Sequence, residues 1–289
     1  MIEQDLLHRF LFEELGVRGE WVKLTTSWQA AKRHQRCSEN MQQQLGQALA
    51  AVVMLSATVK FKGSMILQAQ GNGDIRTLVA QATDQRKIRG LVRGKEDTAA
   101  GPLEAMFGQG QLVLTVESET GQPYQGIVPL QGSNLAAALQ TYFEQSEQLK
   151  TRLWLFANAT DAVGLLLQEL PAQENYKSDW EHIEILANTV TEQELFELDC
   201  EPLLYRLFNQ EKVRLFDAEP VEFSCACSRS NIERTLFAMG QAELEDILKE
   251  RDVIEVNCEF CGEHYHFDKI DVANILAEKN TANDSETRH

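Results

Sequence analysis

The sequence predicts an α+β fold in three parts: an N-terminal, mostly antiparallel sheet domain with packed helices, a helical linker, and a small C-terminal domain with four cysteines. Three observations support this division. Strand patterns joined by turn residues alternate with helical patterns over residues 1–172, short acidic helical patterns fill 173–223, and two close cysteine pairs lie within 224–280. The polar end of the chain, 281–289, is expected to be a flexible tail.

Two helices are expected near the start. DLLHRFLFEEL places Leu7, Phe10 and Leu11 at helical spacing after Asp5, which predicts a short amphipathic helix with Asp5 as its N-cap. Residues 39–57 predict a second, more buried helix. The apolar run ALAAVVMLSATV is too short for a membrane span, which needs about 18 apolar residues.

Strands dominate the rest of the first domain. Apolar runs flank GNG at 71–73 and TGQP at 120–123, which predicts two hairpins. A helix is expected over 134–149, with Ser133 or Asn134 as its N-cap. The expected strands are SMILQAQ, DIRTLVAQA, KIRGLVRG, QLVLTVES, YQGIVPL, RLWLFANA and GLLLQEL. GNGDIR is no dinucleotide-binding fingerprint, because it lacks the third glycine and opens a strand.

The linker predicts short amphipathic helices. The apolar face in DWEHIEILANTV consists of Trp180, Ile183 and Ala187, widened by Ile185, Leu186 and Val190. TEQELFEL begins with a capping-box pattern from Thr191 to Glu194. EPLLYRLFNQEKVRLF adds Leu203, Leu204, Leu207 and Phe208. These segments are too short to form a core of their own, so we expect them to dock on a larger surface.

Acidic residues are concentrated in the last two fifths of the chain. The formal net charge is −17, yet residues 1–172 hold 16 Lys and Arg against 17 Asp and Glu, whereas 173–223 hold 4 against 13 and 224–280 hold 6 against 12. Nucleic-acid binding depends on clustered Lys and Arg, so no nucleic acid is expected as a partner.

This charge pattern gives a docking hypothesis. The acidic linker would cover a basic-rimmed, apolar sheet surface, with burial of its apolar residues supplying most of the energy. The expected basic rim is Lys60, Lys62, Arg86, Lys87, Arg89, Arg93 and Lys95. The candidate linker and client-binding surface is Trp180, Leu186, Phe196 and Leu204. The alternative is that the cations form an ordinary solvated face.

The N-terminus predicts a cytoplasmic protein without a secretory signal, and no membrane partner is expected. MIEQDLLHRFLFEE has acidic residues before any apolar stretch and no small-residue cleavage site. Thiols are kept reduced in the cytoplasm, so clustered cysteines there are metal ligands or reversible redox groups.

The two cysteine pairs predict a metal site. Cys225 and Cys227 form a C-x-C pair, and Cys258 and Cys261 form a C-x-x-C pair thirty residues further on. Four soft thiolates in two close pairs are the ligand set that zinc prefers, so one four-thiolate Zn²⁺ site is expected.

Nearby residues refine this site. Gly262 can take the positive φ that a zinc-knuckle turn needs. His264 and His266 are expected to alternate along a strand rather than to bind metal. Cys37 and Cys200 lack a neighbouring thiol in the sequence and are expected to be incidental.

The metal is expected to hold the C-terminal region together. The apolar set of 224–280 is small and includes Leu236, Phe237, Leu244, Ile247, Leu248, Ile254, Phe260, Phe267, Ile270 and Leu276. A domain of this size is marginal from burial alone. A structural zinc site contributes on the order of 10–16 kcal/mol, against about 5–15 kcal/mol for a whole typical domain. Loss of the metal should therefore unfold this region.

The spacing alone leaves three functions open. Oxidation of a thiolate pair to a disulfide would eject the metal and make the site a reversible redox switch. The zinc ribbon could instead be purely structural and bind a fixed protein partner. A dithiol oxidoreductase would use Cys258 and Cys261, but it needs a helix after the motif, and GEHYHFDKID predicts an extended segment. Hydrolase and nucleotide-binding motifs are not found in the sequence.

The residues also carry a family resemblance. CACS and CEFCG, together with LHRFLFEELGVRGEWV, YFEQSEQLKTRL and LLLQELPAQ, resemble the bacterial redox-regulated chaperones known as the 33-kilodalton heat-shock protein family. The similarity runs over nearly the whole chain. Lys150 replaces a usual proline and Val163 interrupts a usual Gly-Gly pair, which affects local loop geometry only.

The resemblance implies an ATP-independent holdase rather than an enzyme. The reduced protein would hold Zn²⁺ and be inactive. Oxidation would pair Cys225 with Cys227 and Cys258 with Cys261, release zinc, unfold the C-terminal region and destabilise the linker. The exposed apolar surface would bind unfolding client proteins, the active form would be a homodimer, and thioredoxin- or glutaredoxin-type reductants would reverse the change.

Overall fold

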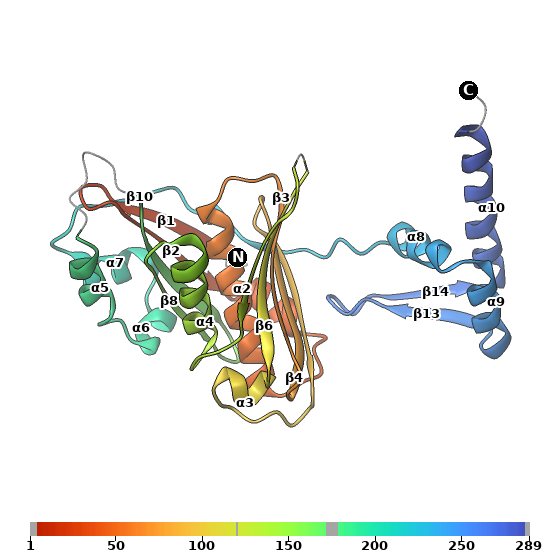
Figure 1. The fold of residues 1–289 in the computed structure, drawn as a ribbon, viewed down its shortest axis with the longest axis horizontal. Coiled ribbons are helices and arrows are strands. Elements are labelled where there is room, and N and C mark those ends of the chain that lie inside the picture. The colour runs from red at the N-terminus through yellow and green to blue at the C-terminus, as the bar shows by residue number, and fades with distance from the viewer. Residues whose placement is uncertain (1–4, 120, 172–178, 287–289) are drawn as a thin grey trace. The chain divides into compact units, whose positions relative to one another are not determined.

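The computed structural model describes the backbone of residues 5–119, 121–171 and 179–286 (Figure 1). The chain divides into two compact units, Met1–Ser224 and Cys225–His289. The expected boundary at 172–173 and residues 287–289 lie outside the described residues.

Among the described residues, six strands form the first sheet of the first unit. The order is β10-β1-β2-β9-β8, all antiparallel, and β11 also pairs with β1. The strands are β1 (Leu6–Phe12), β2 (Val17–Leu24), β8 (Thr151–Ala157), β9 (Ala162–Glu169), β10 (Val213–Leu215) and β11 (Glu219–Pro220). RLWLFANA and GLLLQEL are thereby confirmed as strands.

The opening segment is strand β1, so the prediction of a helix there is wrong. Both faces of β1 are covered: Leu7 lies in the main core, whereas Phe10 and Phe12 pack in a second cluster. A strand that is buried on both faces lacks regular alternation of apolar and polar residues, and its spacing can therefore resemble that of a helix.

Asp5 does cap the start of a helix, but that helix begins about twenty residues further along the chain. Its carboxylate accepts hydrogen bonds from the backbone N–H groups of Thr25 at 2.8 Å and Ser27 at 2.6 Å, at the start of α1 (Thr26–Lys32). These donors have no partner within the helix, and the negative charge is favourable at the helix N-terminus.

The second sheet has the order β12-β5-β4-β3-β6-β7 among the described residues. Its strands are β3 (Gly63–Gly71), β4 (Ile75–Thr83), β5 (Lys87–Gly94), β6 (Gly110–Ser118), β7 (Tyr124–Pro129) and β12 (Glu222–Phe223). The pairings are antiparallel except for β12 beside β5. Both predicted hairpins and the mostly antiparallel architecture are confirmed, although Thr120 of TGQP lies outside the described residues.

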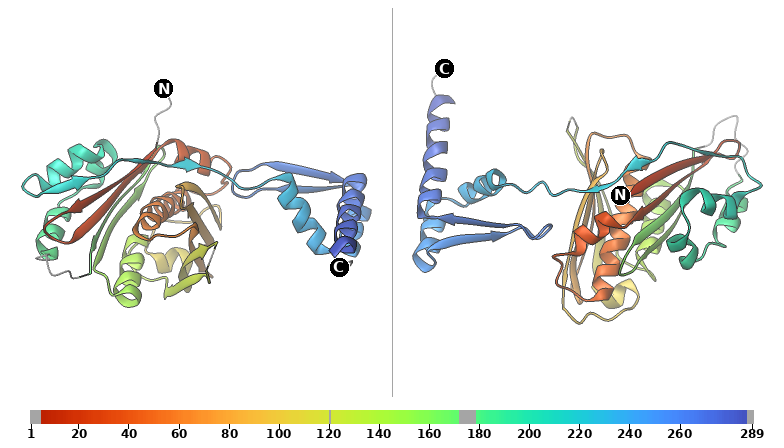
Figure 2. Two further views of the ribbon diagram at one scale, coloured as in Figure 1. Left: turned by 90° about the horizontal axis from the view of Figure 1, so that it is seen from above. Right: turned by 180° about the vertical axis from the view of Figure 1, so that it is seen from behind.

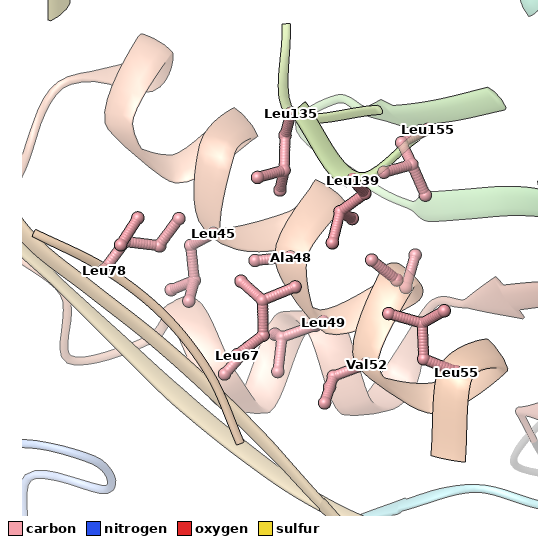
Figure 3. Packing of buried hydrophobic residues seen from close by; sticks show 14 of the residues in the cluster. Leu45, Ala48, Leu49, Val52, Leu55, Leu67, Leu78, Leu135, Leu139 and Leu155 are labelled. Atoms are coloured by element: carbon pink, nitrogen blue, oxygen red, sulfur yellow. The ribbon is translucent and has the colours of Figure 1, made fainter. Parts of the chain in front are cut away.

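Helix α2 (Glu39–Thr58) fills the space between the two sheets and confirms the predicted buried helix (Figures 1 and 3). Ser38 caps its start by accepting a hydrogen bond from the N–H of Met41 at 3.4 Å. Figure 3 shows Leu45 and Leu49 of α2 beside Leu67 and Leu78 of the second sheet. Each such side chain contributes about 1.5–3 kcal/mol by burial, so this layer supplies much of the stability of the first unit.

The predicted helix over 134–149 ends early. Asn134 caps α4 (Leu135–Tyr142) by accepting a hydrogen bond from the N–H of Ala137 at 2.9 Å. A π-helical turn, η1 (Phe143–Glu147), follows and ends at Gln148, whose φ is +54°. The short α3 (Leu103–Phe107) packs near the other end of the second sheet.

The linker residues form three helices on the first sheet, on the face away from α2 (Figures 1 and 2). They are α5 (Trp180–Ala187), α6 (Glu192–Glu197) and α7 (Cys200–Phe208). The capping box of Thr191 and Glu194 is present, as predicted. Ile185 is 67% exposed, so its expected place on the apolar face is wrong: it points to solvent on α5, while Ile183 is fully buried.

The expected basic rim is not where these helices dock, because the seven cations lie on or beside the second sheet. The helices pack instead against apolar side chains of the first sheet: Phe10, Phe12, Val17, Trp21, Val163, Leu165 and Leu167. Arg86 does contact the acidic segment, through Glu219, whereas Lys95 pairs with Asp74. The cations are close together in the sequence, but the strands that carry them belong to the second sheet, whereas the linker helices pack on the first.

The second unit contains α8 (Arg229–Met239), α9 (Gln241–Glu250), the hairpin β13 (Val253–Asn257) with β14 (His264–Asp268), and α10 (Lys269–Glu286). Its buried cluster is small: Leu236, Leu244, Leu248, Ile254, Phe267, Val272 and Ile275. Ile270 was expected in this core but is 71% exposed, because Val272 and Ile275 occupy the inner face of α10. The backbone of α10 is helical through Glu286, into the segment expected to be a tail, since nothing after Lys269 breaks a helix.

Candidate metal centre

The four predicted thiols lie together in the second unit. The Sγ atoms of Cys225, Cys227, Cys258 and Cys261 all lie within 4.8 Å of one another, and each residue is partly buried. The closest contacts join the two halves: Cys225 to Cys258 at 3.6 Å and Cys227 to Cys261 at 3.3 Å.

The start of α8 positions the first pair. Ser228 follows Cys227 directly and caps α8 by accepting a hydrogen bond from the N–H of Asn231 at 3.2 Å. The side-chain amide of Asn231 in turn donates to the carbonyl oxygen of Ala226 at 2.7 Å. The residue between the two cysteines is therefore fixed to the first turn of the helix.

The β13–β14 hairpin positions the second pair. The N–H of Gly262 donates to the carbonyl of Cys258 at 2.7 Å, and the N–H of Cys258 donates to the carbonyl of Glu263 at 2.8 Å. Gly262 has φ +72°, as the sequence predicted for a knuckle turn. Both thiols of the pair are thus held on one tight turn.

This donor set fits a zinc ion. Zinc–sulfur bonds of about 2.3 Å in a tetrahedron place sulfur atoms roughly 3.8 Å apart, which is close to the separations of these four atoms. His264 and His266 both lie on the exposed side of β14, paired with Asn257 and Glu255, and neither belongs to the thiol cluster. Their predicted alternation along a strand is confirmed.

The thiols differ in their tendency to ionise. Burial disfavours the thiolate of Cys258, but hydrogen bonds from the backbone N–H groups of Cys261 and Phe260 outweigh it and lower its pKa. Burial raises the pKa of Cys261, and its thiol neighbours raise it further. Cys258 therefore has more thiolate character than Cys225 or Cys261, whose pKa values are raised, before any metal binds.

Sequence reasoning missed two side chains that support the site. The hydroxyl of Tyr265 donates to Sγ of Cys227 at 3.4 Å. The guanidinium of Arg229 lies 4.4 Å from the ring centre of Phe267 and pairs with Asp271 at 2.8 Å. Alternation in HYHFD could have placed Tyr265 on the side of Phe267, but no sequence signal links it to a particular thiol.

The other two cysteines lie outside the cluster. Cys37 is partly buried beside the main core, and Cys200 is buried at the start of α7. Burial raises the pKa of both thiols, to about 12 for Cys200, helped there by Glu201 and Asp199. Both are therefore protonated and poorly reactive in this fold.

Comparison with known proteins agrees with this picture. The model of the family described as Hsp33 protein matches residues 5–268. The chain is 56% identical to the 33 kDa chaperonin of Nitrosococcus oceani over the full length of both chains, and 42% identical to that of Aliivibrio fischeri over 97% of this chain and 98% of the relative.

A solved structure shares the fold. The crystal structure of the 33 kDa chaperonin (heat shock protein 33 homolog) of Thermotoga maritima superposes with a TM-score of 0.80 at 24% identity, covering 96% of this chain and 99% of that one. Within the described residues, no helix has the length and apolar character needed to cross a membrane. The match over most of the chain and the high identity over its full length show that the chain belongs to the Hsp33 family.

Proposed function

We propose that the protein is a redox-regulated, ATP-independent holdase chaperone of the cytoplasm. The observation that carries the proposal is the convergence of four thiols, within 4.8 Å, in a unit with a small core of its own. The printed names of the relatives, all 33 kDa chaperonins, support a chaperone rather than an enzyme. The strand β14 after Cys261 also argues against a dithiol oxidoreductase, which needs a helix there.

In the reduced state, Cys225, Cys227, Cys258 and Cys261 would hold one Zn²⁺ as thiolates. When bound, the ion would cross-link the segment before α8 to the β13–β14 hairpin. Its positive charge would stabilise the four sulfurs as thiolates. Because the buried cluster beside them is small, this cross-link would supply a large share of the stability of the second unit.

Oxidation would convert each cysteine pair to a disulfide. Two thiolates and two protons react with one peroxide molecule to give one S–S bond and two waters, so two peroxides oxidise the whole set. We propose the pairs Cys225–Cys227 and Cys258–Cys261. The two cysteines of each pair remain close in sequence after the zinc–sulfur bonds break. A disulfide within a pair therefore closes only a short loop, at little entropic cost. Two ligands are lost with each bond, and the zinc would leave.

The second unit would then unfold, and the linker helices would loosen from the first sheet. Ser224 and Cys225 are consecutive, and the N–H of Ser224 donates to the carbonyl of Ile88 at 2.9 Å, so the last ladder contact of the first unit adjoins the first thiol. Of the candidate surface, Trp180 and Leu204 are buried on the first sheet, and Leu186 and Phe196 pack partly buried beside them. Detachment of the linker helices would expose their apolar side chains, and the apolar face of the first sheet, to unfolding client proteins.

The active form would be a homodimer, and thioredoxin- or glutaredoxin-type reductants would return it to the resting state. The exposed faces of the first sheet and of the linker are both apolar, which favours association as well as client binding. Because only one residue separates Cys225 from Cys227, their disulfide should be strained and easily reduced.

The decisive experiment follows zinc and chaperone activity together. Peroxide is added at raised temperature while a chromogenic chelator reports zinc and light scattering reports aggregation of a heat-denatured test enzyme. Zinc release and suppression of scattering should rise in parallel. Zinc that stays bound under these conditions would overturn the proposal in favour of a structural ribbon, and catalytic reduction of insulin would favour an oxidoreductase.

A further inference from the structure

The hydroxyl of Tyr265 lies at the sulfur of one of the four clustered thiols. It donates a hydrogen bond to Sγ of Cys227 at 3.4 Å. Tyr265 is on β14, where it pairs with Val256 of β13, and its half-buried ring packs against the small core of the second unit. Phe267, two residues further along the same face of the strand, is fully buried. The hairpin therefore fixes the ring, and the ring holds the hydroxyl at the sulfur.

A second contact keeps Cys227 beside this strand. Arg229 lies two residues after Cys227, and its guanidinium donates to the carbonyl of His266 at 3.0 Å. The same group lies 4.4 Å from the ring centre of Phe267 and 2.8 Å from a carboxylate oxygen of Asp271. None of these contacts involves a metal ion. The position of the hydroxyl at Sγ is therefore a property of the fold of this unit.

The sulfurs receive hydrogen bonds of two kinds. Backbone N–H groups donate to the sulfurs of Cys225, Cys258 and Cys261. The sulfur of Cys227 receives the side-chain hydroxyl of Tyr265. A backbone donor is present whatever the side chain, whereas this hydroxyl depends on the type of residue at position 265. The hydrogen bond to Cys227 is therefore the one that a single substitution can remove.

A hydrogen bond to a thiolate draws electron density away from the sulfur. A thiolate sulfur has enough lone pairs to bind an ion and to accept a hydrogen bond at the same time. Partners that hydrogen-bond to a metal ligand commonly raise the affinity for the metal about 10- to 100-fold. Oxidation uses the same electrons, because the sulfur attacks a peroxide oxygen with a lone pair. A bond that stabilises the ligand therefore also slows its oxidation.

We propose that Tyr265 sets the oxidant threshold of the redox switch by restraining the sulfur of Cys227. That sulfur attacks peroxide to give a sulfenic acid, and the other peroxide oxygen takes up a proton and leaves as water. Attack by the thiolate of Cys225 on the sulfenic sulfur then forms the disulfide, and with a second proton releases a second water. The hydroxyl of Tyr265 slows the first of these steps. The inference rests on the proposed redox function and names the residue that tunes it.

The test compares the reduced, full-length parent with Tyr265→Phe, which keeps the ring and removes the hydroxyl. Both proteins are loaded with Co²⁺, because its complexes with thiolates have absorption bands that arise from charge transfer from sulfur to metal. Loss of the hydrogen bond should move these bands to lower energy, since a more electron-rich sulfur gives up charge more easily. The affinity for zinc, measured by competition with a chromogenic chelator, should fall about tenfold.

Two further proteins separate hydrogen bonding from packing. Val256→Ala is the matched structural control, because Val256 pairs with Tyr265 across the hairpin and its side chain has no hydrogen-bond donor. It should destabilise the second unit and leave the Co²⁺ bands where the parent has them. A tyrosine with one fluorine beside the hydroxyl, incorporated at position 265, is a stronger donor and should move the bands to higher energy. This replacement decides the question if Tyr265→Phe does not fold.

The rate of oxidation gives the second measurement. Zinc-loaded protein is treated with less than one equivalent of peroxide in the presence of excess zinc, and the first disulfides are located by alkylation and mass spectrometry. In Tyr265→Phe, the Cys225–Cys227 disulfide should form several times faster than in the parent, with little change at Cys258–Cys261. Unchanged Co²⁺ bands, or equal acceleration of both pairs, would overturn the inference, because either result would make Tyr265 a packing residue only.

Failure of the redox proposal has a different signature. A parent protein that is oxidised but gains no anti-aggregation activity would overturn the holdase, while shifted Co²⁺ bands in Tyr265→Phe would leave the effect on Cys227 standing. Parent and Tyr265→Phe proteins that suppress aggregation at the same peroxide concentration, with the same Co²⁺ bands, would retain the holdase and remove the role of Tyr265.

Discussion

Glu219 bridges two arginines of different sheets: its carboxylate lies 2.7 Å from a guanidinium nitrogen of Arg9 on β1 and 3.0 Å from Nε of Arg86, just before β5. Arg86 also donates to the carbonyl of Ser56 near the end of α2. Its side chain is 10% exposed and that of Glu219 is 29% exposed, so the bridge is only partly screened by water. The end of the linker is thereby tied to both sheets.

Glu219→Gln should loosen this tie. The amide keeps the shape but removes the negative charge that both guanidinium groups contact, which should lower the free energy of unfolding of the first unit by about 1–2 kcal/mol. Urea unfolding followed by tryptophan fluorescence measures this. Glu13→Gln removes an exposed pair with Arg214 and is the matched control, with a change of about 0.5 kcal/mol or less. Equal effects of both variants would contradict the assigned role.

Double replacement of Phe196 and Leu204 by serine should give a chaperone that is active without oxidant. Leu204 is buried on the first sheet, and truncation of a buried leucine costs about 2–5 kcal/mol. The linker helices should then detach while zinc stays bound. Light scattering of a heat-denatured enzyme, measured under reducing conditions, reports the result.

The matched control for this variant is Ile185→Ser, since Ile185 lies on the same group of helices but is 67% exposed. It should remain inactive when reduced. If the double variant also fails to suppress scattering, the contact between linker and first sheet does not restrain activity.

Cys261→Ser should remove metal binding and unfold the second unit. One ligand is lost from the thiol cluster, and the buried set of this unit is too small to compensate. Zinc content and limited proteolysis of purified protein measure the effect, which should appear as rapid cleavage after residue 224. Cys37→Ser, outside the cluster, should keep both zinc and protease resistance. A zinc-free Cys261→Ser protein that resists protease would refute the structural role of the metal.

Glu20 should make stability depend on pH. Burial raises the pKa of its carboxyl to about 7 from 4.5, although Arg18, Arg9 and Arg86 act against this. A raised pKa means that the fold favours the protonated form. The resulting stabilisation is complete below about pH 4.5 and is lost as the pH rises through about 7.

Glu20→Gln, which cannot ionise, gives the comparison. Between pH 4.5 and 8 the free energy of unfolding of the parent should fall relative to the variant by on the order of 3 kcal/mol. Urea unfolding at a series of pH values measures the difference. Parallel curves for the two proteins would show that Glu20 does not titrate in this range.

Short-range patterns predicted the thiol site well. The C-x-C and C-x-x-C spacings fix which sulfurs can share an ion, and Gly262 adopts the positive φ that the turn required. Capping residues such as Asn134 and Thr191 were also correct, because a cap depends on groups within four residues. Caps and turns of this kind depend on residues that are close together in the sequence.

Contacts between distant segments could not be predicted in this way. Asp5 serves α1 rather than its own segment, and β1 looked helical because a linker nearly two hundred residues away covers its second face. Tyr265 reaches Cys227 only through the hairpin. The prediction that the linker docks beside the basic residues was wrong for the same reason, since the local sequence does not show which sheet a strand joins.

Ser224, whose N–H donates to the carbonyl of Ile88 on β5, directly precedes Cys225, the first of the four clustered thiols. If the second unit unfolds after oxidation, as proposed, the change begins one peptide bond away from this hydrogen bond. A flexible spacer inserted between Ser224 and Cys225 should therefore keep the change from reaching the helices on the first sheet.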